Sequence, residues 1–219
     1  MQTYYATRAP YYDEVYLKPE RREDIAFISA YLAQRLHGRR VLEVACGTGY
    51  WTQHIAKTAT FVHATDATHE PLAFAKHRPG TQDTQFSLAD AYSLPEHLGQ
   101  FDGAFAGLWF SHVPIGDREA FFHSLHARLT PGARVILIDN SQVQCLEHPI
   151  IERDADGNTY QMRSLKDGSV HRVLKIFPTE TELSALIAPF AANHTYTPLQ
   201  NFWLLEYEFH TPRFRPAGR

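Results

Sequence analysis

A carboxylate and a pair of glycines stand close together near residue 45 of the chain. Glu43 lies within the short apolar run 41–45, and Gly47-Thr48-Gly49 follows it. The run predicts a buried parallel strand, and a glycine turn lets backbone N–H groups approach a ligand closely. Because helical spacing of apolar residues begins at Tyr50, the turn should lead into a helix N-terminus. That arrangement is typical of a nucleotide-binding site.

The details of this turn favour one class of cofactor. A dinucleotide fingerprint requires a third glycine, but Thr52 occupies its place. Glu43 would repel a pyrophosphate, whereas it could accept hydrogen bonds from a cationic amino group. The sequence 41–49, V-L-E-V-A-C-G-T-G, resembles the first motif of class I S-adenosylmethionine (SAM)-dependent methyltransferases. A dinucleotide site and a turn without a ligand are the alternatives.

Further motifs follow in the order and spacing of that family, across about 40–140. Asp66 ends the apolar run 61–66, where a carboxylate can accept hydrogen bonds from both ribose hydroxyls; the alternative is a helix N-cap. The resemblance implies that Asp90 and the backbone of Ala91 bind the adenine, although Asp90 could be a simple loop residue. It also implies that Glu43 and the glycine turn bind the methionine part. The complete set of cofactor contacts that the resemblance implies is Glu43, Ala45, Gly47, Thr48, Gly49, Trp51, Asp66, Ala67, Asp90, Ala91 and Leu108.

Two residues are candidates for catalysis. Methyl transfer is an in-line displacement at a sulfonium carbon, so the protein mainly aligns donor and acceptor. His112 follows the strand predicted at 101–109 and is a candidate base or orienter, because neutral imidazole accepts a proton near pH 7. A packed or capping histidine is the alternative. The segment Ala9-Pro10-Tyr11-Tyr12-Asp13 resembles an A-P-x-Y-D motif of the family, which makes Tyr12 the second candidate.

The segment 4–16 is rich in tyrosine, which disordered tails are not, so we expect it to be ordered. It either packs as an arm on the domain or forms a lid whose rings face the sulfonium. The candidate contacts to the acceptor, drawn from this segment and from the ends of later elements, are Tyr5, Trp109, Phe110, Asp139 and Arg163.

The remaining pattern predicts an α/β fold with a doubly wound, mostly parallel sheet, and the resemblance implies seven strands. Two antiparallel strands are expected at 194–198 and 201–210, followed by a loose tail. Asp167-Gly168 between two alternating runs predicts an inserted β-hairpin, either a substrate cover or an edge or dimer contact. We expect one domain, 1–219, with an N-terminal lid and helix at 1–38 and the inserted hairpin within 141–178.

Composition narrows the partners. The chain has 219 residues, 44% of them apolar, and a net charge of −3 with dispersed basic residues, which disfavours a nucleic-acid partner. No apolar run approaches the roughly 20 residues that span a membrane. Cys46 and Cys145 lack metal-ligand spacing, and the N-terminus lacks the pattern of a signal peptide. We therefore expect a cytoplasmic monomer or homodimer without a metal.

These observations predict an enzyme that methylates an oxygen or nitrogen atom of a small molecule and releases S-adenosylhomocysteine (SAH). One alternative is aminopropyl transfer from decarboxylated SAM, although only Asp139 suggests the acidic site that a diamine needs. Another is a non-catalytic SAM-binding protein. Protein or RNA methylation is disfavoured by the charge and by the sequence Leu108-Trp109-Phe110-Ser111, which replaces the Asn/Asp-Pro-Pro-Tyr motif of nucleic-acid amino-methylating enzymes.

Overall fold

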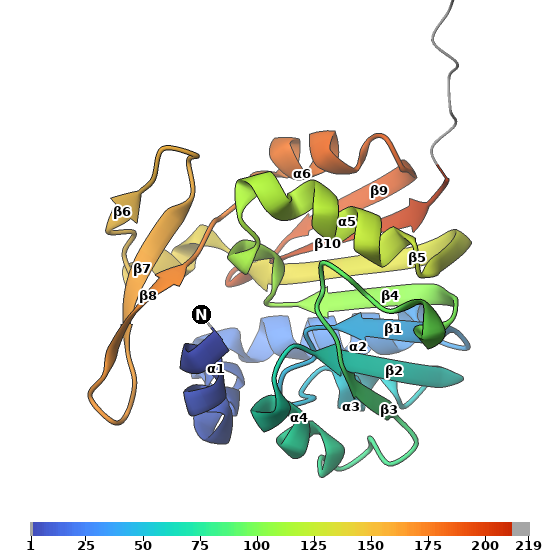
Figure 1. Cartoon of the computed structure of the whole chain (residues 1–219), viewed down its shortest axis with the longest axis horizontal. Helices are drawn as coiled ribbons and strands as arrows, with labels where there is room; N and C mark the ends of the chain where they lie inside the picture. Colours follow the sequence, from blue (N-terminus) through green and yellow to red (C-terminus); the bar gives the residue numbers. More distant parts are fainter. Residues whose placement is uncertain (1, 212–219) are drawn as a thin grey trace, which may run out of the picture.

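A computed structural model describes residues 2–211 of the chain. Its centre is a seven-stranded sheet in the order β3-β2-β1-β4-β5-β10-β9 (Figure 1). The strands are β1 (Arg40–Val44), β2 (Phe61–Asp66), β3 (Gln85–Leu88), β4 (Phe101–Gly107), β5 (Leu129–Asn140), β9 (Ala191–Pro198) and β10 (Phe202–Phe209). The first five pair in parallel, and β10 runs antiparallel to β5 and β9. This confirms the predicted doubly wound sheet, whose order reverses between β1 and β4.

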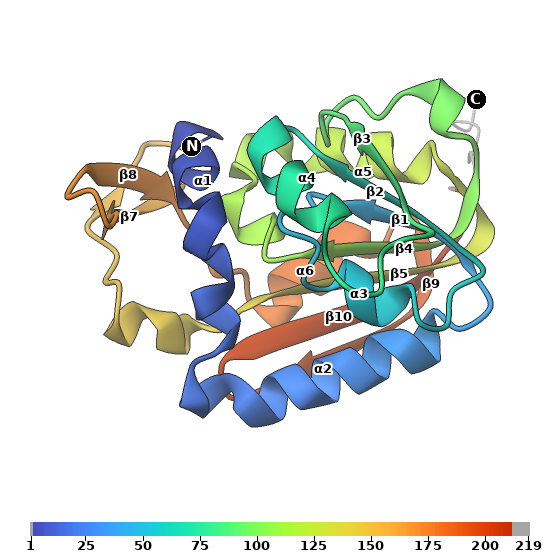
Figure 2. The same ribbon diagram turned by 90° about the horizontal axis from the view of Figure 1, so that it is seen from below.

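Helices cover both faces of this sheet because the central strands are apolar on both faces. Leu42 and Val44 of β1 belong to one buried cluster, which includes residues of α5 and α6. Val41 points to the opposite face and packs with α2 and α3. Figure 2 shows α2 running along that second face. The helices are α1 (Gln2–Arg8), α2 (Arg22–Arg35), α3 (Thr52–Ile55), α4 (His69–Lys76), α5 (Arg118–His126) and α6 (Glu180–Ile187).

Several element boundaries differ from the prediction. The helix expected from Tyr50 is only the single turn α3. β4 ends at Gly107 instead of residue 109, because Leu108 adopts a left-handed backbone conformation with φ of 56°. β5 includes Gly132, whose φ of 83° is a conformation that glycine adopts without a steric penalty.

Two additions lie beyond the carboxyl ends of the parallel strands. The predicted hairpin is present as β7 (Thr159–Ser164) and β8 (Val170–Leu174), joined by the short strand β6 (Glu152–Arg153) in a separate sheet. α1 continues into the 3-10 segment η1 (Ala9–Tyr16), and Figures 1 and 2 both place α1 beside this small sheet. Tyr4 of α1 packs there against Leu165 and Val173.

The helix α6 begins with a capping box. The side chain of Thr179 accepts a hydrogen bond from the backbone of Glu182, whose carboxylate accepts one from the backbone of Thr179. Within the part of the chain that the structure describes, no helix has the length and apolar character to cross a membrane. The expected loose tail, 213–219, lies outside the described residues.

Candidate active site

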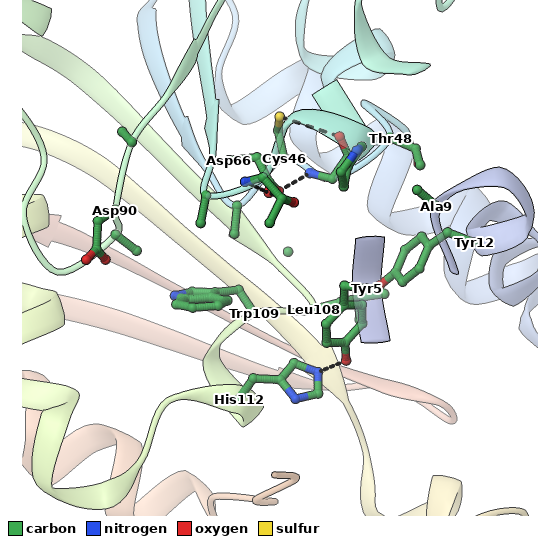
Figure 3. Close-up of a pocket in the computed structure, with 18 of the residues that line it drawn as sticks. Tyr5, Ala9, Tyr12, Cys46, Thr48, Asp66, Asp90, Leu108, Trp109 and His112 are labelled. Carbon is green, nitrogen blue, oxygen red and sulfur yellow. Dashed lines mark hydrogen bonds between the residues drawn. The ribbon is translucent and has the colours of Figure 1, made fainter. Parts of the chain in front are cut away.

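A cavity of about 400 Å³ lies at the carboxyl ends of β1, β2, β3 and β4, beneath α1 and η1 (Figure 3). This volume is within the range, roughly 300–1,000 Å³, of small-molecule sites. The predicted cofactor residues that line it are Ala45, Gly47, Thr48, Trp51, Asp66, Ala67, Asp90, Ala91 and Leu108. Glu43 and Gly49, which were also predicted, do not line it. The topology therefore gathers residues from the ends of four strands, β1, β2, β3 and β4, that are far apart in the sequence.

Glu43 lies on β1 under the glycine turn and is 1% exposed. Its Oε2 atom has no hydrogen-bond partner of ordinary geometry among residues 2–211, although the Thr52 hydroxyl is near enough to oppose part of the effect of burial on the carboxyl pKa. Burial raises the pKa of this carboxyl to about 8. A buried acceptor without a donor is rare in native proteins and requires an explanation, such as a group that binds there.

Asp66, at the end of β2, is oriented by backbone groups from two elements. Its Oδ2 atom accepts a hydrogen bond from the Gly47 N–H at 3.0 Å, and its Oδ1 atom accepts from the backbone and hydroxyl of Thr68, both at 3.0 Å (Figure 3). Asp90 is exposed and accepts from the Tyr92 N–H at 3.0 Å. These contacts fix the carboxylates at the cavity without using all of their acceptor capacity.

Two lining residues have left-handed backbone conformations although neither is glycine. Ala45 follows β1 with φ of 54°, and Leu108 follows β4 with φ of 56°. Such conformations cost about 1–3 kcal/mol each and concentrate at functional sites. Gly107 beside them has a different role, because a Cβ there would lie 2.8 Å from the Phe105 ring and 2.9 Å from Trp51. The tight turn at the end of β4 therefore requires a residue without a side chain.

His112 is held in one neutral form at the opposite wall of the cavity. Its Nδ1 atom lies 2.6 Å from the carbonyl oxygen of Leu174, which can only accept, so Nδ1 carries the hydrogen. Its Nε2 atom therefore accepts from the Tyr5 hydroxyl at 2.7 Å (Figure 3). Burial, together with the positive charge of Lys175, lowers the pKa of His112 to about 3. The ring of Tyr12 packs edge-on against the ring of Tyr5, with the centroids 6.1 Å apart. The hydroxyl that bonds to His112 is that of Tyr5, and not that of the predicted Tyr12.

The N-terminal segment is attached to the glycine turn. Asp13 of η1 accepts a hydrogen bond from the Thr48 hydroxyl at 2.6 Å and forms an ion pair with Arg78. Arg78 also donates to the Thr48 carbonyl at 2.8 Å. Tyr16 stacks on Tyr50 with ring centroids 3.7 Å apart. The acid of the predicted A-P-x-Y-D motif thus connects this segment to the cavity wall.

A second, polar cavity of about 180 Å³ adjoins the first. The two cavities share Tyr5, Tyr12, Leu108 and His112. Trp109, a predicted acceptor contact, lines the first cavity, and Arg163, another, lines the second.

The structure does not bring two predicted acceptor contacts to either cavity. Phe110 is 0% exposed and packs on the aromatic rings of Phe121 and Phe122, because the chain turns back towards the core after β4. Asp139 is also 0% exposed and accepts from the Lys175 ammonium and from the Ser111 backbone, both at 2.8 Å. Its charge is therefore neutralised inside the protein.

Sequence reasoning missed several residues at this site. The carbonyl of Leu174 fixes the tautomer of His112, and Lys175 neutralises Asp139. Arg8 and Gln144 line the second cavity. No spacing marks a backbone carbonyl in advance, although the basic residues of the inserted hairpin were a general signal. In the described residues, no group of three or more His, Cys, Asp or Glu side chains could hold a metal ion.

Comparison with known proteins gives a consistent family. Residues 41–132 match a family described as a methyltransferase domain. The O-methyltransferase rstn1 of Aspergillus nomiae is 34% identical over 134 residues, which cover 55% of this chain and 58% of that protein. A ubiquinone biosynthesis O-methyltransferase of Psychrobacter cryohalolentis is 28% identical over 182 residues, covering 78% of this chain and 68% of that protein. The chain thus spans little more than half the length of the first of these relatives.

Solved structures resemble nearly the whole chain. The DhpI–SAH complex has a TM-score of 0.75 and 28% sequence identity, covering 95% of this chain and 94% of DhpI. The DhpI–SAM–HEP complex has a TM-score of 0.74 and the same identity, covering 94% of both chains. The similarity therefore extends well beyond residues 41–132.

Proposed function

Because this chain belongs to the class I SAM-dependent methyltransferases, we propose that it transfers a methyl group from SAM to an oxygen atom of a small-molecule acceptor. One observation carries the proposal: the cavity that holds the cofactor motifs meets a second cavity at His112 and Tyr5. The first cavity provides space for the donor, and the second for the acceptor. Oxygen is favoured as the methylated atom because the curated relatives are named O-methyltransferases.

The chain's residues fit the cofactor. Although Glu43 does not itself line the cavity, its Oε2 would accept from the amino group of the methionine part once binding removes the proton that burial keeps on this carboxyl. Asp66 already accepts three hydrogen bonds, and a carboxylate has about four acceptor positions, so about one position remains for a ribose hydroxyl. Asp90 and the backbone of Ala91 lie at the cavity for the adenine. Bound SAM supplies an electrophilic methyl carbon on a positively charged sulfur.

The protein's own groups align the acceptor and receive its proton. His112 Nε2 presents a fixed lone pair where the two cavities meet, and at present Tyr5 donates to it. An acceptor hydroxyl that replaces Tyr5 there would be oriented with its oxygen towards the first cavity. A histidine with a pKa near 3 is a weak base, so the proton leaves as the new O–C bond forms. Tyr5 and Tyr12 help to exclude water from this junction.

The alternative activities have no support at this site. Aminopropyl transfer requires acidic groups for a diamine, and the carboxylate of Asp139 is neutralised by Lys175. A purely SAM-binding protein has no need for a second cavity that opens on His112.

Calorimetric titration with SAM, SAH, decarboxylated SAM and NAD tests the proposal. We expect binding of SAM and SAH alone, followed by a mass increase of one methyl group in the correct acceptor from a panel of hydroxyl compounds and acids. Preference for decarboxylated SAM would favour aminopropyl transfer. Failure to bind any of the four ligands would refute the proposed function.

A further inference from the structure

The second cavity has an excess of positive charge. It lies where η1, the residues after β5 and the inserted hairpin meet. Its charged lining comprises the cationic side chains of Arg8, Lys18, Arg21 and Arg163 and the carboxylates of Glu14 and Glu147.

Both carboxylates of this cavity are already paired. Glu147 forms an ion pair with Lys18, and Glu14 forms one with Lys166, which lies outside the cavity. None of the three arginines forms an ion pair with a residue in the range 2–211. None of the three guanidinium groups is therefore neutralised by a direct ion pair within this range, although Glu147 is near enough to act electrostatically on Arg21.

Arg163 is the most informative of the three. It extends from β7 and is 5% exposed. Its guanidinium donates to the amide oxygens of Gln161 at 2.6 Å and Gln144 at 3.3 Å, both of which are neutral. Burial of a cation is costly unless an opposite charge accompanies it. An anion in the cavity would supply the missing charge.

Two further donors in the cavity have no partner in the described chain. Asn140 is 4% exposed, and its Oδ1 atom accepts from the Lys175 ammonium at 2.9 Å. Since an ammonium only donates, this contact fixes the amide and leaves Nδ2, which has no partner, as a free donor. Arg21 is also 4% exposed, and its Nε atom likewise has no hydrogen-bond partner in the described chain. A ligand rich in oxygen lone pairs would supply the acceptors that these two buried donors lack among residues 2–211.

We propose that the methyl acceptor is an anion whose carboxylate or phosphoryl group binds in this second cavity, on Arg163 and Asn140. This inference rests on the proposed function and specifies its substrate class. The shared residues Tyr5, Tyr12, Leu108 and His112 mark the passage through which the acceptor oxygen reaches the methyl group.

The reaction balances for such an acceptor. Its oxygen forms a bond to the methyl carbon while the carbon–sulfur bond breaks, and the bonding electron pair goes to sulfur, leaving a neutral thioether. An acceptor hydroxyl passes its proton to His112 Nε2, whereas an oxyanion that is itself methylated has no proton to lose. An ionised nucleophile also suits the low basicity of His112.

Titration of the SAH-loaded protein with three aromatic probes tests the inference. Benzoate and phenyl phosphate carry the two anionic groups, and benzamide is their neutral match. We expect one or both anions to bind at least about tenfold more tightly than benzamide, the size of a hydrogen bond to a charged group. The tighter anion identifies the carboxylate or the phosphoryl class.

Variants locate the anion. Arg163→Gln should weaken anion binding by about tenfold or more and leave benzamide and SAH binding unchanged. Arg8→Gln, a change at a half-buried residue of α1, provides a second test in case the first variant does not fold. Arg172→Gln is the matched control, because Arg172 is exposed on the neighbouring strand and pairs with Glu152.

The outcomes separate the inference from the proposed function. Absence of SAH binding refutes the proposed function. SAH binding with equal affinity for benzamide and both anions overturns the inference alone. Anion affinity that is unchanged in both Arg163→Gln and Arg8→Gln also overturns it, because the anion then binds elsewhere.

Discussion

Replacement of Glu43 by glutamine should have opposite effects on the free protein and on its complex with SAH. Burial raises the pKa of this carboxyl from 4.5 to about 8 in the folded protein. Between these values the folded protein holds a proton on Glu43 that the unfolded chain has lost. The free energy of unfolding therefore falls as pH rises from about 4.5 to 8. Glutamine cannot ionise, so this loss should be absent in Glu43→Gln.

The size of the effect follows from the shift. At pH 7 the unfolded carboxyl is ionised and the folded one is mostly protonated. The loss is then about 2.5 pKa units, or about 3 kcal/mol at roughly 1.4 kcal/mol per unit. Wild type should lose that much stability relative to Glu43→Gln between pH 4.5 and 7. Urea unfolding of both ligand-free proteins across this range measures the difference, and Glu96→Gln, at an exposed residue, is the control.

Binding of SAH should favour the ionised form of Glu43 over the protonated form. We propose that Glu43 accepts from the amino group of the ligand, which requires the ionised carboxylate. Wild type should therefore release close to one proton when SAH binds at pH 7, and Glu43→Gln should release less and bind SAH more weakly. Calorimetry in buffers of different ionisation enthalpy counts these protons. Parallel stability curves, together with equal proton release from wild type and variant, would refute both the buried protonated state and the role of Glu43.

Three other predictions concern residues with distinct positions. Asp66→Ala should weaken SAM binding by about 1–3 kcal/mol, because ribose donors lose their acceptor. The control Asp83→Ala, at an exposed position, should leave SAM binding unchanged. Equal affinities of wild type and Asp66→Ala by calorimetry would show that Asp66 is not part of the site. His112→Ala and Tyr12→Phe should lower kcat more than SAM affinity, and full turnover in both variants would contradict the proposed roles of His112 in receiving the proton and of Tyr12 in excluding water. Phe110→Ala should lower the free energy of unfolding by about 3–5 kcal/mol through a core cavity, and a raised KM without lost stability would return Phe110 to the acceptor site.

The grouping of the predicted cofactor residues around the first cavity could be foreseen because its signals are local. The glycine turn and Asp66 each stand at the end of an apolar run, and parallel strands place their carboxyl ends at one edge. The cofactor motifs therefore converge once the strands are located. Even there, the left-handed conformation of Leu108 carries no sequence mark, since leucine does not favour it.

The acceptor half depends on contacts between distant segments, for which the sequence holds no spacing rule. Tyr5 and His112 are 107 positions apart, so the choice among several N-terminal tyrosines is made by packing. Asp139 had the position of a binding residue at the end of β5. The opposing charge that neutralises it, Lys175, lies 36 residues later, after the inserted hairpin. The burial of that ion pair depends on tertiary packing, which the local sequence does not indicate.

The inserted hairpin and the residue that follows it make three separate contacts at the second cavity and at its junction with the first. Leu174 fixes the tautomer of His112, Lys175 neutralises Asp139 and lowers the pKa of His112, and Arg163 places a positive charge in the second cavity. None of these three residues belongs to the strands that carry the cofactor motifs. Changes in the hairpin should therefore alter which acceptor is methylated while SAM affinity stays constant. Changes at the ends of β1 and β2 should do the reverse, because the two cavities share only the passage between them.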